Sequence, residues 1–101
     1  MYKKGLKLLP NYMQDGVVKY IEHGIDGGGF LNAVLENNFV HALGRADMIN
    51  ERMIKQWAEF LYMHAPSQCW GSVEKVAEWK RKGGFVGIEE WQEKIKADAE
   101  S

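Results

Sequence analysis

The stretch MINERMIKQWAEFLYMH, residues 48–64, decides the fold. Four of its apolar residues recur at i, i+3, i+4 and i+7, the spacing of the buried stripe of a helix: Ile54, Trp57, Ala58 and Leu61. Three others widen that stripe well beyond one face: Met53, Phe60 and Tyr62. No segment of the chain shows the sustained alternation of β-branched residues that indicates a strand. The sequence therefore predicts an all-α fold with a long central helix at about 48–64.

Shorter helices are predicted on the N-terminal side of this central helix. The first runs from about 11 to 23, and Gly24 is a suitable left-handed residue to end it. The glycine-rich segment 24–29 that follows suits a loop and no regular element. Two further helices are expected at about 30–37 and 39–46.

Polar residues and a proline mark the ends of the central helix and the start of the next one. Asp47 or Asn50 can serve as its N-cap, and Pro66 stops it. After a loop, Ser72 is a good N-cap for a helix at about 73–82.

The last predicted helix begins at about Ile88 and places Ile88, Trp91 and Ile95 at i, i+3 and i+7. Residues 85–101 contain five acidic residues and two lysines, a net charge of −3, so this C-terminal helix is acidic. The three cations Lys80-Arg81-Lys82 lie just before it. The two parts of this helical pair therefore differ in the sign of their charge.

Length and composition limit the possible classes of protein. The 101 residues suit one helical domain over 1–101, which we expect to be a compact bundle of about five helices. With 46% hydrophobic residues and a net charge of −1, the chain is not of a disordered class. No window is apolar enough for a membrane span, and a pI near 6.3 argues against a nucleic-acid partner. So many apolar residues in a small domain favour a homo-oligomer.

The residues that usually carry catalysis or bind metals are not arranged for either role. The three histidines, His23, His41 and His64, form no i, i+4 pair around a glutamate, so no metal or other cofactor is implied. Cys69 is best interpreted as a small residue packed in an ordered loop. Without a nucleophile–base pair or a phosphate loop at diagnostic spacing, we do not expect an enzyme.

Six residues are candidates for binding a ligand: Gly28, Gly29, Arg45, Asp47, Asn50 and Trp70. The glycines enter a predicted helix, whose free amides can bind an anion, although a tight turn with positive φ explains them too. Arg45 can hold a phosphate, but Asp47 can equally cap the central helix with Arg45 as its surface partner. Trp70 offers a face for stacking or fills the core.

Two groups of motifs resemble a family of small uncharacterised proteins of tailed bacteriophages and prophages. One is GGFLNAVLEN at 28–37 with GRAD at 44–47 and Asn50, and the other runs from FLY at 60–62 through CWGS at 69–72 to Trp79. The similarity covers residues 8–84, and the acidic helix at 85–101 is less typical of the family. The resemblance implies a phage origin and a place in the host bacterial cytoplasm, and it assigns no catalytic residue.

A small accessory phage protein without an enzymatic motif usually acts by binding. The first hypothesis is a counter-defence protein that sequesters a small nucleotide-derived immune signal in a pocket between helices or subunits. The alternative is a protein–protein adaptor or inhibitor of a host bacterial factor, which would use the exposed tryptophans, methionines and acidic tail. An enzyme that uses Cys69 or a histidine ranks third.

Overall fold

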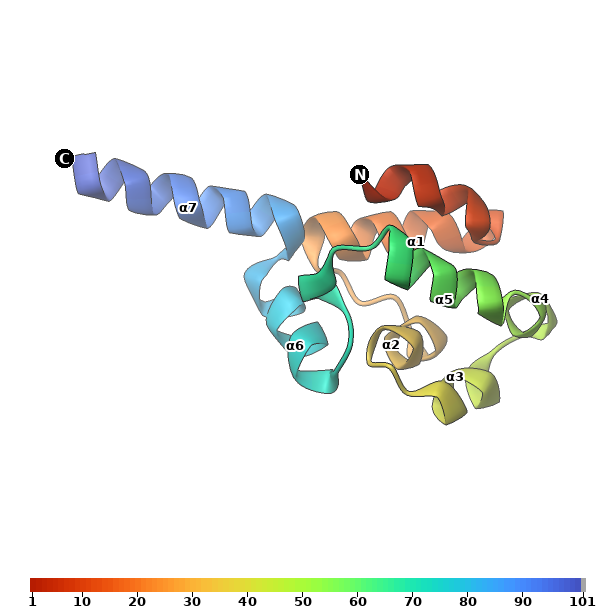
Figure 1. The fold of residues 1–101 in the computed structure, drawn as a ribbon. Coiled ribbons are helices and arrows are strands. Elements are labelled where there is room, and N and C mark those ends of the chain that lie inside the picture. The colour runs from red at the N-terminus through yellow and green to blue at the C-terminus, as the bar shows by residue number, and fades with distance from the viewer. Residues whose placement is uncertain (101) are drawn as a thin grey trace.

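The structure is a computed structural model that describes residues 1–100, with the side chains of residues 1–99. Within residues 1–100 the chain forms helices and no strand, which confirms the all-α prediction (Figure 1). In chain order these are the 3-10 helix η1 (Tyr2–Leu8), α1 (Asn11–His23), α2 (Gly29–Leu35), α3 (Phe39–Arg45), α4 (Met48–Arg52), α5 (Ile54–Met63), the 3-10 helix η2 (Ser67–Cys69), α6 (Val73–Lys82) and α7 (Gly84–Glu100).

The prediction of about five helices is wrong, because residues 1–100 form seven α-helices and two 3-10 helices. The predicted central helix at 48–64 is two helices, α4 and α5, joined at Met53. The Met53 amide donates to the carbonyls of both Ile49 and Asn50, each at 3.1 Å, so the last turn of α4 tightens toward 3-10 geometry. The Trp57 amide donates to the Met53 carbonyl at 3.0 Å, and α5 therefore continues with no intervening loop.

The local signals for helix ends are confirmed. The side chains of Asp47 and Ser72 accept hydrogen bonds from the third amides after them, at 2.8 and 3.1 Å, and cap α4 and α6. Gly24 ends α1 with φ at 70°. Each of these ends depends only on residues within one turn of it.

The last helix begins earlier than Ile88 because α6 turns directly into it. Gly83 ends α6 with φ at 79°, and Gly84, with φ at 67°, starts α7 at once. A Cβ atom at Gly84 would lie 2.6 Å from the backbone nitrogen of His23, so α7 starts in close contact with the end of α1. The body of the molecule lies on one side of this junction and most of α7 projects from the other, which gives extents of 54 × 25 × 20 Å (Figure 1).

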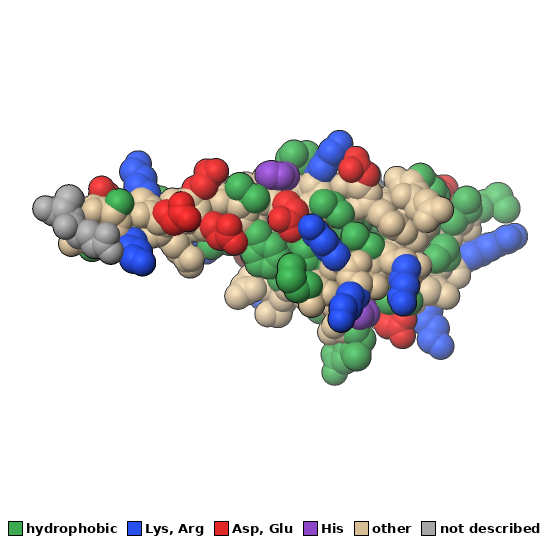
Figure 2. All heavy atoms as spheres, turned by 90° about the horizontal axis from the view of Figure 1, so that it is seen from above, with side chains coloured by type: hydrophobic (Ala, Val, Ile, Leu, Met, Phe, Trp, Pro, Cys, Tyr) green, Lys and Arg blue, Asp and Glu red, His purple; other side chains and the backbone are tan. Residues whose placement is uncertain are grey.

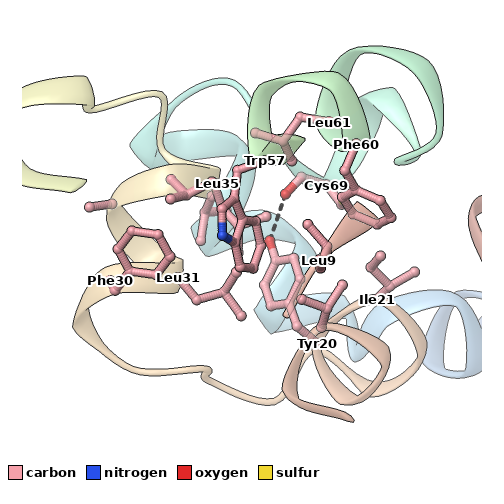
Figure 3. Packing of buried hydrophobic residues seen from close by; sticks show 14 of the residues in the cluster. Leu9, Tyr20, Ile21, Phe30, Leu31, Leu35, Trp57, Phe60, Leu61 and Cys69 are labelled. Carbon is pink, nitrogen blue, oxygen red and sulfur yellow. Dashed lines mark hydrogen bonds between the residues drawn. The ribbon is translucent and has the colours of Figure 1, made fainter. Parts of the chain in front are cut away.

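The core lies between α1, α2, α5 and α6 and is rich in aromatic rings (Figure 3). Trp57 extends from α5 toward α2, where its ring meets Phe30 edge-on at 5.4 Å between centroids. The Tyr20 hydroxyl donates to the carbonyl oxygen of Cys69 at 2.7 Å and ties α1 to η2. Cys69 is fully buried, and this burial raises the pKa of its thiol to about 12. The interpretation of Cys69 as a packed loop residue is therefore confirmed.

The buried face of α5 differs from the predicted stripe. Trp57 and Leu61 are buried as expected, but Ala58 is exposed and Phe60 is buried in its place. The 3-10 helix η1 packs against α5 and covers part of it that a periodic stripe does not specify. The buried face of α5 therefore includes Phe60 and leaves Ala58 and Tyr62 on the surface.

Candidate functional site

The structure places the six predicted ligand residues in separate surroundings. Gly28 and Gly29 lie at the start of α2, which the side chain of Arg45 reaches from the end of α3; Asp47 and Asn50 lie at the start of α4, and Trp70 follows η2. Trp70 lines an open surface hollow beside Tyr62, and the other five residues line neither that hollow nor the cavity between α2, α3 and α5. The six therefore do not line a common pocket in a single copy of the chain.

The start of α2, where we expected an anion, already holds a carboxylate of the chain. Asp26 Oδ2 accepts from the Gly28 amide at 2.9 Å, and Oδ1 accepts from Lys80 Nζ at 2.6 Å and Asn32 Nδ2 at 2.8 Å. These donors, Lys80 first, hold the pKa of Asp26 far below its usual range. Gly28 adopts φ of 92°, so the interpretation of this segment as a turn that needs positive φ is confirmed.

Arg45 and Asp47 do not form the expected surface pair. The Arg45 guanidinium lies over Gly29, where an added Cβ atom would come within 2.7 Å of Nη1, and it makes no ion pair within residues 1–99. Asp47 instead accepts from the Asn50 amide at 2.8 Å and from the Tyr12 hydroxyl at 2.5 Å. These two bonds lower the pKa of Asp47, and the bond to Asp47 raises the pKa of Tyr12 to about 12. The capping role of Asp47 is confirmed, and the salt bridge to Arg45 is wrong.

Asn50 serves the interior of the fold. Its side chain is only 3% exposed, and its Oδ1 accepts a hydrogen bond from Trp57 Nε1 at 3.0 Å. The amide thereby satisfies the polar atom of the largest buried side chain in the core. Its position leaves it no access to a ligand on the surface.

A hollow that none of the six predicted residues lines lies between α2, α3 and α5. Each of these helices contributes one alanine to it, Ala33, Ala42 and Ala58, and these small side chains leave a cavity of about 90 Å³. Its walls are mostly apolar and include Phe39, Trp57 and Leu61, and Asn37 and Asn38 are their polar members. We call this hollow, together with the outer part described next, the α2–α3–α5 groove.

The outer part of the groove is wider and carries aromatic and charged side chains. An open hollow of about 500 Å³ adjoins the inner cavity and shares Ala58 and Leu61 with it. Tyr62, 81% exposed, and the half-buried Trp70 line this outer part together with Lys55 and Glu59.

Polar groups along the groove have spare bonding capacity. Trp70 Nε1 is buried without a hydrogen-bond partner, and no ion pair joins Lys55 to Glu59 within residues 1–99. Trp70 packs against the core, as the interpretation that it fills the core predicts. It also lines the groove, so part of its side chain faces the hollow where a ligand could stack.

Sequence reasoning missed every groove residue except Trp70. The alanines carry no chemical signal of their own, and Tyr62 was assigned to the buried stripe. The adjacent pair Phe39-Val40 at the start of α3 gives no signal either, because the adjacent pair Phe30-Leu31 in the equally short α2 is buried. Both Phe39 and Val40 are exposed.

The groove is lined by apolar, aromatic and charged side chains. Among the described side chains, no three His, Cys, Asp or Glu residues come together as a metal site. No helix within the described residues is long and apolar enough to cross a membrane.

No protein-family model, no curated protein and no solved structure matches the chain. The resemblance to phage proteins therefore stays a prediction.

Proposed function

We propose that this protein is a binding module that holds an amphipathic helix of another protein in the α2–α3–α5 groove. One observation carries the proposal. The groove has an apolar floor of three alanines, and the exposed rings of Phe39 and Tyr62 lie at its margins. Large exposed apolar side chains around a concave surface mark interaction sites more often than chance placement does.

The size and shape of the groove favour a helix over a small molecule. An enclosed site for a small molecule usually measures roughly 300–1,000 Å³; the inner cavity here measures about 90 Å³, and the outer part of about 500 Å³ is an open surface hollow and not an enclosed site. The inner cavity suits one or two aliphatic side chains of a helix that lies across α5. The partner's next anchor, one turn along, would reach the outer hollow of about 500 Å³ beside Tyr62 and Trp70.

The charges at the outer part define the polar side of the partner. Lys55 and Glu59 lie one turn apart on α5, and both are exposed. A partner helix that presents an acid and a base at the same spacing would pair with both. The predicted resemblance to phage proteins implies the host bacterial cytoplasm, and we propose that the protein acts there as an adaptor or inhibitor of a host factor in counter-defence.

Sequestration of a small nucleotide-derived immune signal is the second candidate function. The observation that favours it is the Arg45 guanidinium beside Gly29, without an ion pair in residues 1–99. Against it, Asp26 already accepts the hydrogen bond of the Gly28 amide. Titration with cyclic dinucleotides and cyclic ADP-ribose isomers by thermal shift tests it, because a bound ligand raises the melting temperature by mass action. No shift with any of them rejects this candidate.

The groove is tested by filling it. Ala58 is exposed, so Ala58→Trp fills the groove without a new buried side chain, and Ala77→Trp on the exposed face of α6 is the matched control. A photo-reactive residue at position 62 first identifies the partner segment in bacterial lysate, and a synthetic peptide of that segment is then titrated. We expect Ala58→Trp to weaken peptide binding by tenfold or more, about 1.4 kcal/mol, and Ala77→Trp to leave it unchanged. Equal binding by both variants, or a peptide that stays unfolded when bound, overturns the proposal.

A further inference from the structure

Most of α7 lies outside the body of the molecule (Figure 1). Only its first turns are packed, where Phe85 meets the ring of Trp79 edge-on at 5.1 Å and Ile88 lies against the core. Every described side chain from residue 91 to 99 is exposed. At 1.5 Å per residue, this exposed part extends about 13 Å into solvent.

The projecting part of α7 carries an apolar stripe that nothing in the described chain covers. Trp91 is 62% exposed and Ile95 is 49% exposed, and with Ile88 they follow the i, i+3, i+7 spacing of one helix face. An isolated helix of this length is marginal in water, because helical stability comes mainly from packing of the apolar face. A helix with such a stripe is stabilised when a partner covers it.

A hollow next to this stripe is shaped to receive a side chain. It measures about 460 Å³ and lies at the corner of α6 and α7, between Ile88 and Trp91 on one helix and Arg81 and Lys82 on the other. Gly87 also lines the hollow and adds no side chain to it. The stripe and the hollow are therefore adjacent on one surface, one projecting and one concave.

The charges on this surface also differ from one end to the other. At the corner, Arg81 and Lys82 both pair with the single carboxylate of Glu78, which leaves a net positive charge. Along α7, the three acids Glu89, Glu90 and Glu93 come first, and residues 94–99, with Lys94, Lys96 and Asp98, carry a net charge of +1; Figure 2 shows acidic and basic side chains along this helix. An antiparallel neighbour would place its Lys94 and Lys96 level with Glu90 and Glu89, whereas a parallel neighbour would place acidic beside acidic.

We infer that α7 is a dimer interface, and that its occupant is the α7 of a second copy of this chain in antiparallel orientation. A two-fold axis near Gln92 brings Ile95 of each copy to the Ile88–Trp91 hollow of the other, so one surface supplies both the stripe and the hollow. Trp91 would bury roughly 150 Å² of its surface per copy in this interface, because it is 62% exposed and a side chain of this kind can bury up to about 250 Å². A standard interface buries about 800 Å² per partner, so this small interface gives a weak, reversible dimer.

This inference is independent of the proposed function, because it uses no residue of the α2–α3–α5 groove. Sedimentation equilibrium of the full chain over a wide concentration range measures it. We expect a monomer–dimer equilibrium in the wild type and a tenfold or larger loss of association in Trp91→Glu and Ile95→Glu. Glu93→Gln, on the opposite face of α7, is the matched control. Circular dichroism checks that each variant stays folded, and a wild type that is monomeric at every concentration overturns the inference.

Engineered cysteines test the orientation, since the native Cys69 is fully buried. In an antiparallel pair only residues near the two-fold axis face their own counterparts. We therefore expect Gln92→Cys to form a disulfide-linked dimer under mild oxidation and Ala99→Cys to stay monomeric. Efficient cross-linking at Ala99 shows a parallel pair and overturns the antiparallel arrangement.

Discussion

Replacing Asn50 by leucine separates a structural role of this residue from a role in ligand binding. Asn50 Oδ1 accepts the hydrogen bond of the buried Trp57 Nε1 at 3.0 Å, and no other bond to that nitrogen is present in the described residues. Leucine has the same branching and the same number of side-chain heavy atoms but no acceptor, so the indole N–H would remain buried and unpaired. A buried donor that loses its partner costs about 1–3 kcal/mol. We expect the free energy of unfolding to fall by this amount.

Urea denaturation at constant pH measures the change, with an unchanged slope as the check that the denatured state is the same. For a domain of this size each kcal/mol corresponds to about 4–8 °C in melting temperature, so the loss is easily resolved. Asn11→Leu, at an exposed position in the first turn of α1, is the control and should change stability by less than about 0.5 kcal/mol. The hydrogen bond itself is measured by a double-mutant cycle with Trp57→Phe, in which we expect a coupling of about 0.5–3 kcal/mol. Wild-type stability in Asn50→Leu, combined with loss of partner or ligand binding, would refute the structural role.

Three further predictions concern other parts of the fold. Gly84→Ala should destabilise the chain by more than about 1 kcal/mol, because φ at Gly84 is positive and the new Cβ would meet the backbone of α1. Gly16 lies within a helix with open space around it, so Gly16→Ala should stabilise the chain by about 0.5–1 kcal/mol. Equal effects of the two substitutions in urea denaturation contradict this prediction. Cys69, whose pKa is raised to about 12 by burial, should react with a thiol reagent at neutral pH only as fast as the chain unfolds, and rapid labelling of the folded protein would show an open thiol. The pKa of Asp26 is lower in the folded chain than its value of about 3.9 in the unfolded chain, so its stabilising effect is fully present above that value and is lost as the pH falls below it. Lys80→Met should reduce this loss in acid, and an unchanged pH profile of stability contradicts the assignment.

Features that depend on one turn of chain were predictable from the sequence. The side chains of Asp47 and Ser72 bond to amides three residues later, and Gly24 takes the left-handed conformation that stops α1. These interactions involve neighbours in sequence, so the residue types alone nearly determine them. The all-α class followed from the same local patterns.

Features that depend on distant contacts were not predictable from periodicity. The buried face of α5 includes Phe60 and excludes Ala58 because η1, some fifty residues earlier, packs on that helix. The burial of Asn50 depends in the same way on Trp57 facing inward from α5. A stripe of apolar residues predicts that a helix is partly buried, but the neighbours decide which side of it is covered.

The candidate ligand site combines a local contact that the sequence could predict with a distant contact that it could not. The amides at Gly28 and Gly29 were one candidate anion site beside the alternative of a turn, and the Gly28 amide donates to the carboxylate of Asp26, two residues earlier. An aspartate two residues before a glycine turn is a local signal for such a bond. Its second oxygen is held by Lys80, 54 residues away, and no local pattern predicts that contact.

Together, the two proposed interfaces predict a consequence that neither of them predicts alone. A dimer joined through α7 carries two α2–α3–α5 grooves, since no residue of the groove is used in the α7 interface. A partner with two copies of the recognised helix would bind both grooves, and the second contact would form at a high effective concentration. Trp91→Glu should then weaken binding of the oligomeric partner by tenfold or more while a single peptide binds the variant as well as the wild type. If both are weakened equally, Trp91 acts on the groove itself, and the two surfaces are not separate.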